Sequence, residues 1–369
     1  MRVLLIGNLL SEGQHSMLQF EHHLVTGLKG RGIAVSCLRP SPFFSRLTTR
    51  NRLLWKWLGY LDKFVLFPFR LAFLRIRPTE VIHVCDHSNA IYLNFLPSQR
   101  CLLTCHDLLA VRSARGEFTV HRTGWTGRIL QHWILSGLHR AKLVVCDSGA
   151  TRSDVLRIIG PRPPSEIINI GVADTYFSEV QKTDAGAPGN KRQAKLLSTP
   201  FMLHVGGTQW YKNRPTVRRI YRRLRERLGG ATPALVIVGE ADGVLPQSGE
   251  ELLSDLSVCE LAECYRRAAL LLFPSYAEGF GLPIIEAQAS GCLVVTTGLA
   301  PMNDTGGDAA LYVADPEDVE GFVCAVQRVL TLDPAEAQRR RKLGYQNAER
   351  FRTDAMVAGY LRVYEELAG

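Results

Sequence analysis

Two glutamates and the glycine-rich turn between them are the residues of this sequence best suited to chemistry. Glu278 and Glu286 are separated by seven residues, and Gly279 and Gly281 lie in the turn, which follows the apolar run 270–273. Backbone N–H groups that glycines leave uncovered at the start of a helix bind anions, helped by the helix dipole. Carboxylates accept hydrogen bonds from hydroxyls. The stretch therefore predicts a site for a ligand with both phosphate and vicinal hydroxyls, such as a nucleotide-sugar.

The alternative without a ligand site is that GFGLP is only a turn and that both glutamates are solvated charged residues at helix ends. The longer string PSYAEGFGLPIIEAQASGCLVV, residues 274–295, resembles the signature of retaining glycosyltransferases of the two-domain GT-B fold, in the large bacterial family 4. This resemblance implies two Rossmann-like, doubly wound α/β domains facing across a cleft. It also implies a nucleotide-sugar donor and no requirement for a cofactor or a metal ion.

The resemblance implies roles for individual residues of the turn. Glu278 would hold hydroxyls of the donor sugar, and Glu286 would hold the ribose hydroxyls. Phosphate and sugar would bind to the backbone at Gly279, Phe280, Gly281 and Leu282. Attack from the leaving-group face, with a phosphate oxygen taking the acceptor proton, retains configuration, so neither carboxylate needs to act as a nucleophile.

A second glycine turn, Gly206 and Gly207, follows the strand-like run PFMLHV, with Lys212 six residues after the first glycine. It is similar to the family's phosphate-gripping element, in which a lysine would neutralise charge that develops on the leaving diphosphate. Many relatives carry an arginine or threonine at position 207 and an arginine at position 211, where this chain has Gly207 and Tyr211. The second cation therefore stays open, with Arg214 as one candidate. The plain alternative for Lys212 is a solvated residue at a helix start.

Short apolar runs alternate with helical periodicity along the N-terminal half, which predicts a parallel, doubly wound sheet. Ligands of such sheets bind beyond the carboxyl ends of the strands. The expected strands are Val3–Ile6, Ala34–Leu38, Val81–Cys85, Leu102–Cys105, Leu143–Cys146 and a last one at Ile168–Val172.

Gly7 and His106 are the candidate residues after these strands. The loop after Ile6 lacks the three-glycine dinucleotide fingerprint, and Gly7 would let the ligand approach closely or serve as a plain turn glycine. His106 stands where similar glycosyltransferases have a histidine, which would donate a hydrogen bond to a sugar hydroxyl or to the departing phosphate. The alternative is a structural histidine tied to a backbone carbonyl. Asp107 is a weaker candidate to orient it.

The length of 369 residues predicts two domains. We expect an N-terminal, acceptor-side domain over 1–172, a linker over 173–199 and a C-terminal, nucleotide-sugar-binding domain over 200–369. The last helix, from about 355, is expected either in the second domain or packed back on the first. The nine cysteines are odd in number and mostly lie inside apolar runs, which indicates buried thiols in a reducing cytosol.

Positive charge gathers in the N-terminal half. Residues 1–172 hold 22 Lys and Arg against 10 Asp and Glu, a net charge of +12. The remainder therefore carries −3, which brings the net charge of the chain to +9. Residues 46–77 hold eight of these basic residues, one acid and many aromatics. This segment is expected either to lie on an anionic membrane surface or to form ordinary helices. No nucleic-acid motif appears, so no nucleic-acid partner is expected.

The sequence therefore predicts a cytoplasmic retaining hexosyltransferase. If its substrates are lipid-linked, it would act at the inner face of the membrane. The donor would be a UDP- or GDP-sugar, and the acceptor a glycan, a lipid-linked sugar or a small molecule. Surface polysaccharide or glycoconjugate biosynthesis is the expected pathway. Two alternatives stay open: a nucleotide-sugar epimerase or hydrolase of the same fold, and a non-catalytic sugar-binding module.

Overall fold

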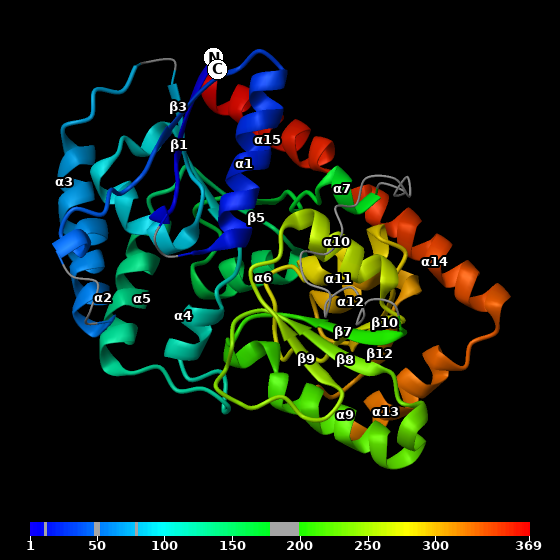
Figure 1. Ribbon diagram of the computed structural model, residues 1–369. Coiled ribbons are helices and arrows are strands. Elements are labelled where there is room, and N and C mark those ends of the chain that lie inside the picture. Colours follow the sequence, from blue (N-terminus) through cyan, green and yellow to red (C-terminus); the bar gives the residue numbers. More distant parts are fainter. Residues whose placement is uncertain (11–12, 48–51, 78–79, 178–198) are drawn as a thin grey trace. The chain divides into compact units, whose positions relative to one another are not determined.

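The computed structural model describes residues 1–10, 13–47, 52–77, 80–177 and 199–369, which form two compact α/β units (Figure 1). The first unit is Met1–Gly171 with Thr353–Gly369, and the second is Val172–Arg352. The expected linker over 173–199 lies mostly outside the described residues, but its start forms the short helix α7 (Asp174–Phe177). The chain's last residues, whose place the sequence left open, belong to the first unit.

The first unit contains a six-stranded parallel sheet in the order β2-β1-β3-β4-β5-β6. The expected doubly wound topology is confirmed, because the chain runs from β1 to β2 on one side and then crosses to β3 on the other, from where it continues in the opposite direction. The strands are β1 (Arg2–Ile6), β2 (Ala34–Leu38), β3 (Glu80–Val84), β4 (Cys101–Cys105), β5 (Leu143–Cys146) and β6 (Ser165–Ile167).

The last strand was expected at Ile168–Val172, and this was wrong. The sheet ends with β6, at Ile167. Ile168 is apolar because it is buried against the terminal helix, where a side chain on Gly359 would come within 3.0 Å of it. An apolar run can serve helix packing as well as a strand, and periodicity alone does not separate the two.

Helices cover both faces of the first sheet. Alternate residues of β1 point to opposite sides, so Val3 and Leu5 pack with α1 and α15, whereas Leu4 and Ile6 pack with α3, α5 and the 3₁₀ segment His87–Phe95. The helices are α1 (His15–Gly30), α2 (Arg52–Leu61), α3 (Phe67–Ala72), α4 (Leu109–Ala114), α5 (Trp125–Leu138), α6 (Gly149–Ile158) and α15 (Thr353–Ala368).

The second unit repeats the architecture with a parallel sheet in the order β12-β11-β10-β7-β8-β9. The core on one face joins Leu235, Leu270 and Val295 to α9 and α13 (Figure 1). The strands are β7 (Phe201–Val205), β8 (Ala234–Val238), β9 (Glu250–Leu253), β10 (Leu270–Phe273), β11 (Leu293–Thr297) and β12 (Leu311–Val313). The helices are α9 (Arg214–Leu228), α10 (Val258–Arg267), α11 (Leu282–Ala289), α12 (Met302–Gly306), α13 (Val319–Leu330) and α14 (Pro334–Ala348).

The edge strand β9 was not expected, because its sequence EELL lacks an apolar alternation. Its first residue, Glu250, is buried, and its Oε1 accepts a hydrogen bond of 2.8 Å from Nε of Arg218 on α9. An ion pair from a distant segment thus permits an acid at this position. Helix α10 begins at Val258 and is capped by Ser257 and Glu260.

All nine cysteines are free, and six of them are buried, as expected for thiols in apolar runs. Among the described helices, none combines the length and the apolar character needed to cross a bilayer.

Gly137 marks the closest approach of α5 to the backbone beneath it. A Cβ atom at this position would lie 2.2 Å from the carbonyl oxygen of Ala90, so we expect Gly137→Ala to lower the free energy of unfolding by about 1–3 kcal/mol. Gly59, inside α2, has no atom within 4 Å of the same added carbon, and Gly59→Ala should instead stabilise by up to ~1 kcal/mol. Urea denaturation of both variants provides the measurement, and equal effects would contradict this assignment of close packing.

Candidate active site

The expected donor-site residues of the second unit gather where its sheet reverses its winding order. β7 and β10 are neighbours, but β7 is followed in sequence by β8 on one side and β10 by β11 on the other. Such a switch point leaves a crevice at the carboxyl ends of the two strands, which is where open α/β sheets bind ligands. The glycine turn 206–207 follows β7, and the GFGLP turn follows β10.

Lys212 and Glu278 meet at this point as an ion pair. The Lys212 Nζ lies 2.9 Å from both carboxylate oxygens of Glu278, and the two side chains are only 14 % and 8 % exposed. The ammonium also lies 5.1 Å from the ring centre of Phe273. Breaking a desolvated pair of this kind leaves an uncompensated charge, at a cost on the order of 3–5 kcal/mol. The pair therefore places a cation and a carboxylate, each largely shielded from water, side by side at the switch point.

Hydrogen bonds on either side of Lys212 fix its loop to the loop after β10. The backbone N–H of Tyr276 donates to the Tyr211 carbonyl at 2.9 Å. Asn213 adopts a left-handed conformation, with φ of 53°, and its amide donates to the Pro274 carbonyl at 2.9 Å. These contacts on Tyr211 and Asn213 hold the residue between them against the second loop, which explains why Lys212 faces Glu278.

The GFGLP turn presents the start of α11. Gly281 caps the helix at a φ of +94°, which an L side chain adopts only with strain. Phe280 is buried, and its carbonyl accepts a hydrogen bond from the Thr305 hydroxyl at 2.6 Å. Leu282 begins the helix, and no acidic residue lies in its first turn. The N-terminus of α11 thus keeps its positive dipole end beside the ion pair.

Glu286, on α11, is 6 % exposed. Its Oε2 accepts a hydrogen bond of 2.9 Å from the Tyr265 hydroxyl, and Tyr176 donates a second one. Burial raises the pKa of the Glu286 carboxyl, against the effect of these two donors and of Lys212. Its oxygens therefore already accept hydrogen bonds from hydroxyl groups, which is the chemistry expected of a ribose contact. Here the hydroxyl groups belong to the two tyrosines.

The second cation that the sequence left open, Arg214, is engaged by backbone. Its guanidinium donates to the Gly206 carbonyl from Nη2 at 2.6 Å and to the Glu240 carbonyl from Nη1 at 2.6 Å. Gly206 itself leaves room for the lysine stem, because an added Cβ would lie 3.1 Å from Cδ of Lys212. The added Cβ of Gly207 would meet only the flexible end of the Gln209 side chain. Arg214 thus braces the turn that supports Lys212.

In the first unit, Gly7 follows β1, which borders the corresponding switch point between β1 and β3. An added Cβ would lie 2.1 Å from Oε2 of Glu21 and 3.0 Å from Nε of Arg39, two side chains that form an ion pair of 2.5 Å. An added side chain would have to displace the buried Glu21 carboxylate, so internal packing favours a glycine here, whether or not a ligand also approaches it.

His106 lies at the carboxyl end of β4, 5 % exposed, with both ring nitrogens engaged. Its Nδ1 is 2.6 Å from Oδ2 of Asp147, and its Nε2 is 2.8 Å from the Cys85 carbonyl. Burial opposes a charge, but the Asp147 carboxylate outweighs it and raises the pKa of His106 to about 9. The ring is thus an imidazolium that donates to both partners. To bind a sugar hydroxyl, it would have to release one of them.

The orienting acid is Asp147, after β5, and not the neighbouring Asp107. Asp107 instead accepts a hydrogen bond from the Leu109 N–H at 2.9 Å, at the start of α4. Asp147 was missed, although it directly follows an expected strand and so occupies a position typical of functional residues. Tyr265 and Tyr176, the partners of Glu286, were missed because nothing in their local sequence indicates that contact.

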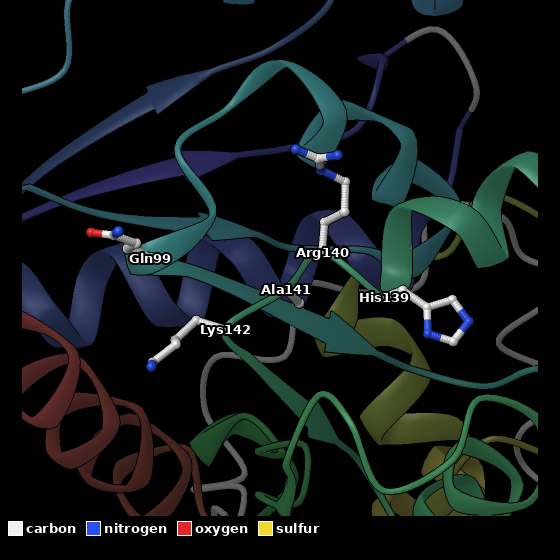
Figure 2. Close-up of a pocket in the computed structure, with 5 residues that line it drawn as sticks. All are labelled: Gln99, His139, Arg140, Ala141 and Lys142. Atoms are coloured by element: carbon white, nitrogen blue, oxygen red, sulfur yellow. The ribbon is translucent and has the colours of Figure 1, made fainter.

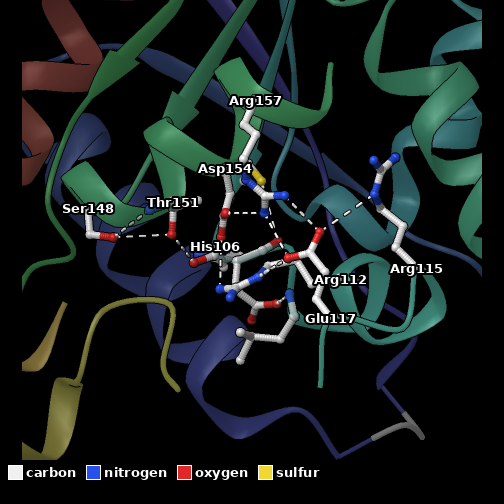
Figure 3. A network of polar contacts seen from close by, with 11 residues as sticks. His106, Arg112, Arg115, Glu117, Ser148, Thr151, Asp154 and Arg157 are labelled. Atoms are coloured by element: carbon white, nitrogen blue, oxygen red, sulfur yellow. Dashed lines mark hydrogen bonds and ion pairs between the residues drawn. The ribbon is translucent and has the colours of Figure 1, made fainter. Parts of the chain in front are cut away.

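The loop that carries His106 is tied to α6 and α4 by polar contacts (Figure 3). The Thr151 hydroxyl donates to the His106 carbonyl at 3.3 Å. Arg112 of α4 bonds Asp154 of α6 at 3.1 Å, and Arg157 of α6 bonds Glu117 at 2.8 Å (Figure 3). Partly exposed pairs like these each contribute little to stability, but several together fix the position of the loop.

Further buried polar groups lie at the same edge of the first sheet. The Asn8 amide donates to Oδ2 of Asp86 at 2.6 Å and accepts from Asn89 at 2.5 Å. Despite burial, nearby His87 and His106 and hydrogen bonds from Asn8 and the Ser88 N–H lower the pKa of Asp86 to about 2. His83 differs from this group, because its ring is inside the core between Tyr364 and Thr104, each at 2.7 Å.

A cavity of about 360 Å³ lies elsewhere, lined by the residues between α5 and β5 and by Gln99 (Figure 2). His139, Arg140 and Lys142 contribute basic side chains to it. These residues precede β5, whereas the candidate site residues follow their strands, so the cavity is at the opposite edge of the sheet.

Residues 199–332 match the family model of glycosyl transferases group 1. The O-antigen chain mannosyltransferase B of Escherichia coli is 26% identical over 71% of this chain and 74% of its own length. Glycogen synthase of Mycobacterium tuberculosis is 32% identical over 65% of this chain, but the match spans only 59% of that relative. The matched part of the chain thus includes the ion pair and the GFGLP turn.

Two solved structures share the fold over nearly the whole chain. Sucrose-phosphate synthase from Thermosynechococcus elongatus superposes with a TM-score of 0.75 at 21% identity, covering 100% of this chain and 99% of that one. A structure described as trehalose-6-phosphate from E. coli bound with UDP-2-fluoro glucose gives a TM-score of 0.69 at 14% identity, covering 100% and 99%. The fold is that of GT-B glycosyltransferases, and the fold and the family match together indicate a glycosyltransferase.

The His106–Asp147 pair makes the free energy of unfolding fall at alkaline pH. Because the folded state raises the pKa of His106 from 6.5 to about 9, the pair's stabilisation is complete below about pH 6.5 and is lost as pH rises through about 9. We expect a loss on the order of 3 kcal/mol in the free energy of unfolding between pH 6 and pH 9.5.

Denaturant titrations of the wild type and of Asp147→Asn at both pH values measure this effect. The variant should lose most of the pH dependence, whereas His132→Gln, a change at an exposed position on α5, should retain it. An equal slope for wild type and Asp147→Asn would contradict the charged pair.

Proposed function

We propose that the protein is a retaining glycosyltransferase that transfers a hexose from a UDP- or GDP-sugar to a glycan, lipid-linked or small-molecule acceptor. The observation that carries this proposal is the Lys212–Glu278 ion pair, with Nζ at 2.9 Å from both carboxylate oxygens, beside the N-terminus of α11 at a switch point. Cation, carboxylate and helix dipole at one crevice suit a ligand that is anionic at one end and hydroxylated at the other.

Lys212 exchanges its partner when the donor binds. The diphosphate replaces Glu278 as the anion beside Nζ, and the released carboxylate accepts hydrogen bonds from the sugar hydroxyls. Lys212 and the amides of Gly279, Phe280 and Gly281 then stabilise the charge that develops on the leaving diphosphate. These groups supply the positive charge, so the proposal requires no metal ion.

The reaction breaks the bond between the anomeric carbon and the phosphate oxygen and forms a bond to the acceptor oxygen on the same face of the sugar. Attack on the same face preserves configuration, and a leaving phosphate oxygen takes the acceptor's proton, which balances charge. Glu286 holds the ribose, Gly7 permits close approach, and His106 contributes an imidazolium charge, donating to the sugar once it releases the Cys85 carbonyl.

We further propose that the enzyme works in the cytoplasm, in surface polysaccharide or glycoconjugate biosynthesis, with residues 46–77 in contact with the inner face of an anionic membrane. The similarity to an O-antigen chain mannosyltransferase supports this pathway. The single acid among these residues also supports the membrane contact.

The donor can be identified by thermal denaturation with a panel of UDP- and GDP-sugars, since a ligand at 100 times its Kd stabilises the folded state by about 2.7 kcal/mol. Release of nucleoside diphosphate that depends on an added sugar acceptor would then support transfer. Release without acceptor would indicate a hydrolase, a changed sugar without acceptor an epimerase, and binding without any release a binding module; each would overturn the proposal.

Glu278→Gln should lower turnover with the selected donor by at least about tenfold, because the amide accepts hydroxyl hydrogen bonds more weakly than a carboxylate. The Kd for the nucleoside diphosphate alone should stay equal or fall, since the change removes a negative charge and releases Lys212. Initial rates and calorimetry measure the two quantities. Glu226→Gln, at an exposed position of α9, is the matched control, and near-normal turnover of Glu278→Gln would remove the assigned role.

Glu286→Ala should weaken binding of the nucleoside diphosphate by about tenfold or more, because charged hydrogen bonds to the ribose are lost. Tyr265→Phe keeps both carboxylate oxygens and removes only the tyrosine partner, so it should retain affinity. Calorimetric titration compares the two variants. An unchanged Kd for Glu286→Ala would exclude the ribose contact.

A further inference from the structure

Most of the large apolar side chains that the described residues expose lie in one part of the first unit, between residues 43 and 133. Well-folded surfaces rarely concentrate such side chains without a partner. The group includes three tryptophans, and the second unit contributes only a few scattered residues. Its members are Phe43, Leu47, Leu54, Trp57, Leu61, Val65, Leu66, Phe69, Phe73, Phe95, Val120, Trp125, Ile129 and Trp133.

Six of these side chains form an apolar stripe along α2 and α3. The two helices are continuous through a π-helical turn, Asp62–Leu66. The stripe residues follow one another at intervals of three or four positions, and Phe73, at its end, is 72 % exposed. The apolar stripe consists of Leu54, Trp57, Leu61, Val65, Phe69 and Phe73.

The π turn keeps the stripe on one face. In an α-helix of 3.6 residues per turn, repeated steps of four residues drift around the axis. A π turn holds more residues per turn, so it corrects the drift between Leu61 and Phe69. The opposite face is fixed to the body of the unit, because Phe67 and Leu71 are buried in the core beside the first sheet. The stripe therefore faces outward on an anchored helix.

Charges around the stripe are of one sign. Asp62 is the only acid between residues 22 and 79. It is buried and accepts hydrogen bonds from the N–H groups of Phe44 and Ser45, at 2.8 and 2.9 Å. In the described part of residues 46–77, the exposed basic side chains are Arg46, Lys56, Arg70, Arg75 and Arg77.

A second apolar row lies on α5. Trp125, Ile129 and Trp133 are each at least half exposed and follow one another at intervals of four residues. No acid occurs between residues 118 and 146, and Arg122 and Arg128 are exposed. Helices α3 and α5 both pack on the 3₁₀ segment 87–95 and share one core cluster. Both rows are therefore on the same side of the first sheet.

We propose that the apolar stripe and the α5 row form one docking face for the surface of an anionic bilayer, so that the proposed contact of 46–77 is one part of a larger face. Apolar and tryptophan side chains enter the headgroup region, and the surrounding cations attract anionic lipids. A second copy of the chain suits the face less well, because a two-fold contact would oppose basic side chains to themselves. The face does not depend on the proposed glycosyl transfer.

The test is co-sedimentation of the full chain, without donor or acceptor, with vesicles of phosphatidylcholine alone or mixed with an equal part of phosphatidylglycerol. We expect binding to the mixed vesicles, weakened by salt, and little binding to phosphatidylcholine alone. Trp57→Glu/Phe69→Glu and Trp125→Glu/Trp133→Glu should each lower the partition coefficient at least about tenfold. Val244→Glu/Leu245→Glu, at exposed apolar positions of the second unit, adds the same charge and should bind as the wild type does.

Thermal melting of each variant establishes that the fold is intact. Wild-type binding by either variant pair of the first unit would overturn the two-helix face, as would no binding of the wild type to the mixed vesicles. Sedimentation velocity adds a separate outcome: a dimer that Trp57→Glu/Phe69→Glu dissociates, with no vesicle binding, would assign the face to a second copy.

Discussion

The direction of the strands is the constraint on which the rest of this molecule depends. Parallel pairing sends every loop that follows a strand to the same edge of its sheet. In the second sheet, β7 and β10 are neighbours with connections that diverge, so the loops after them reach the same edge of the sheet side by side. Lys212 and Glu278, 66 positions apart in the chain, form a close ion pair only because these two loops meet there.

The fold could be predicted from the sequence in outline, because buried parallel strands are short apolar runs that local reading detects. Ala34–Leu38 and Leu143–Cys146 were placed with their observed bounds. The errors concern segments whose structure depends on partners far away in the sequence. Glu250 sits in an edge strand because Arg218 neutralises it, and the run from Ile168 is apolar because α15 covers it. No local pattern contains either fact.

For the candidate site too, the local motif could be predicted from the sequence and the distant contacts could not. The motif around Glu278 was found because its glycines, its proline and the spacing of its acids are all local properties, and the positive φ of Gly281 is one physical reason for them. The partners of the singled-out residues were not found. Asp147 turns His106 into a cation, and two tyrosines engage Glu286. Both contacts join segments that only the folded sheet brings together.

The terminal helix has a consequence for biosynthesis. Tyr360 and Tyr364 of α15 close the core above β3 and β4, where their hydroxyls bond Thr104 and His83. The ribosome makes these residues after all of the second unit. Domains generally fold as they are synthesised, from the N-terminus onward, but here part of the first unit's core is missing until the second unit has been synthesised. The second unit has all its residues earlier, so the unit whose synthesis begins first is completed after the other.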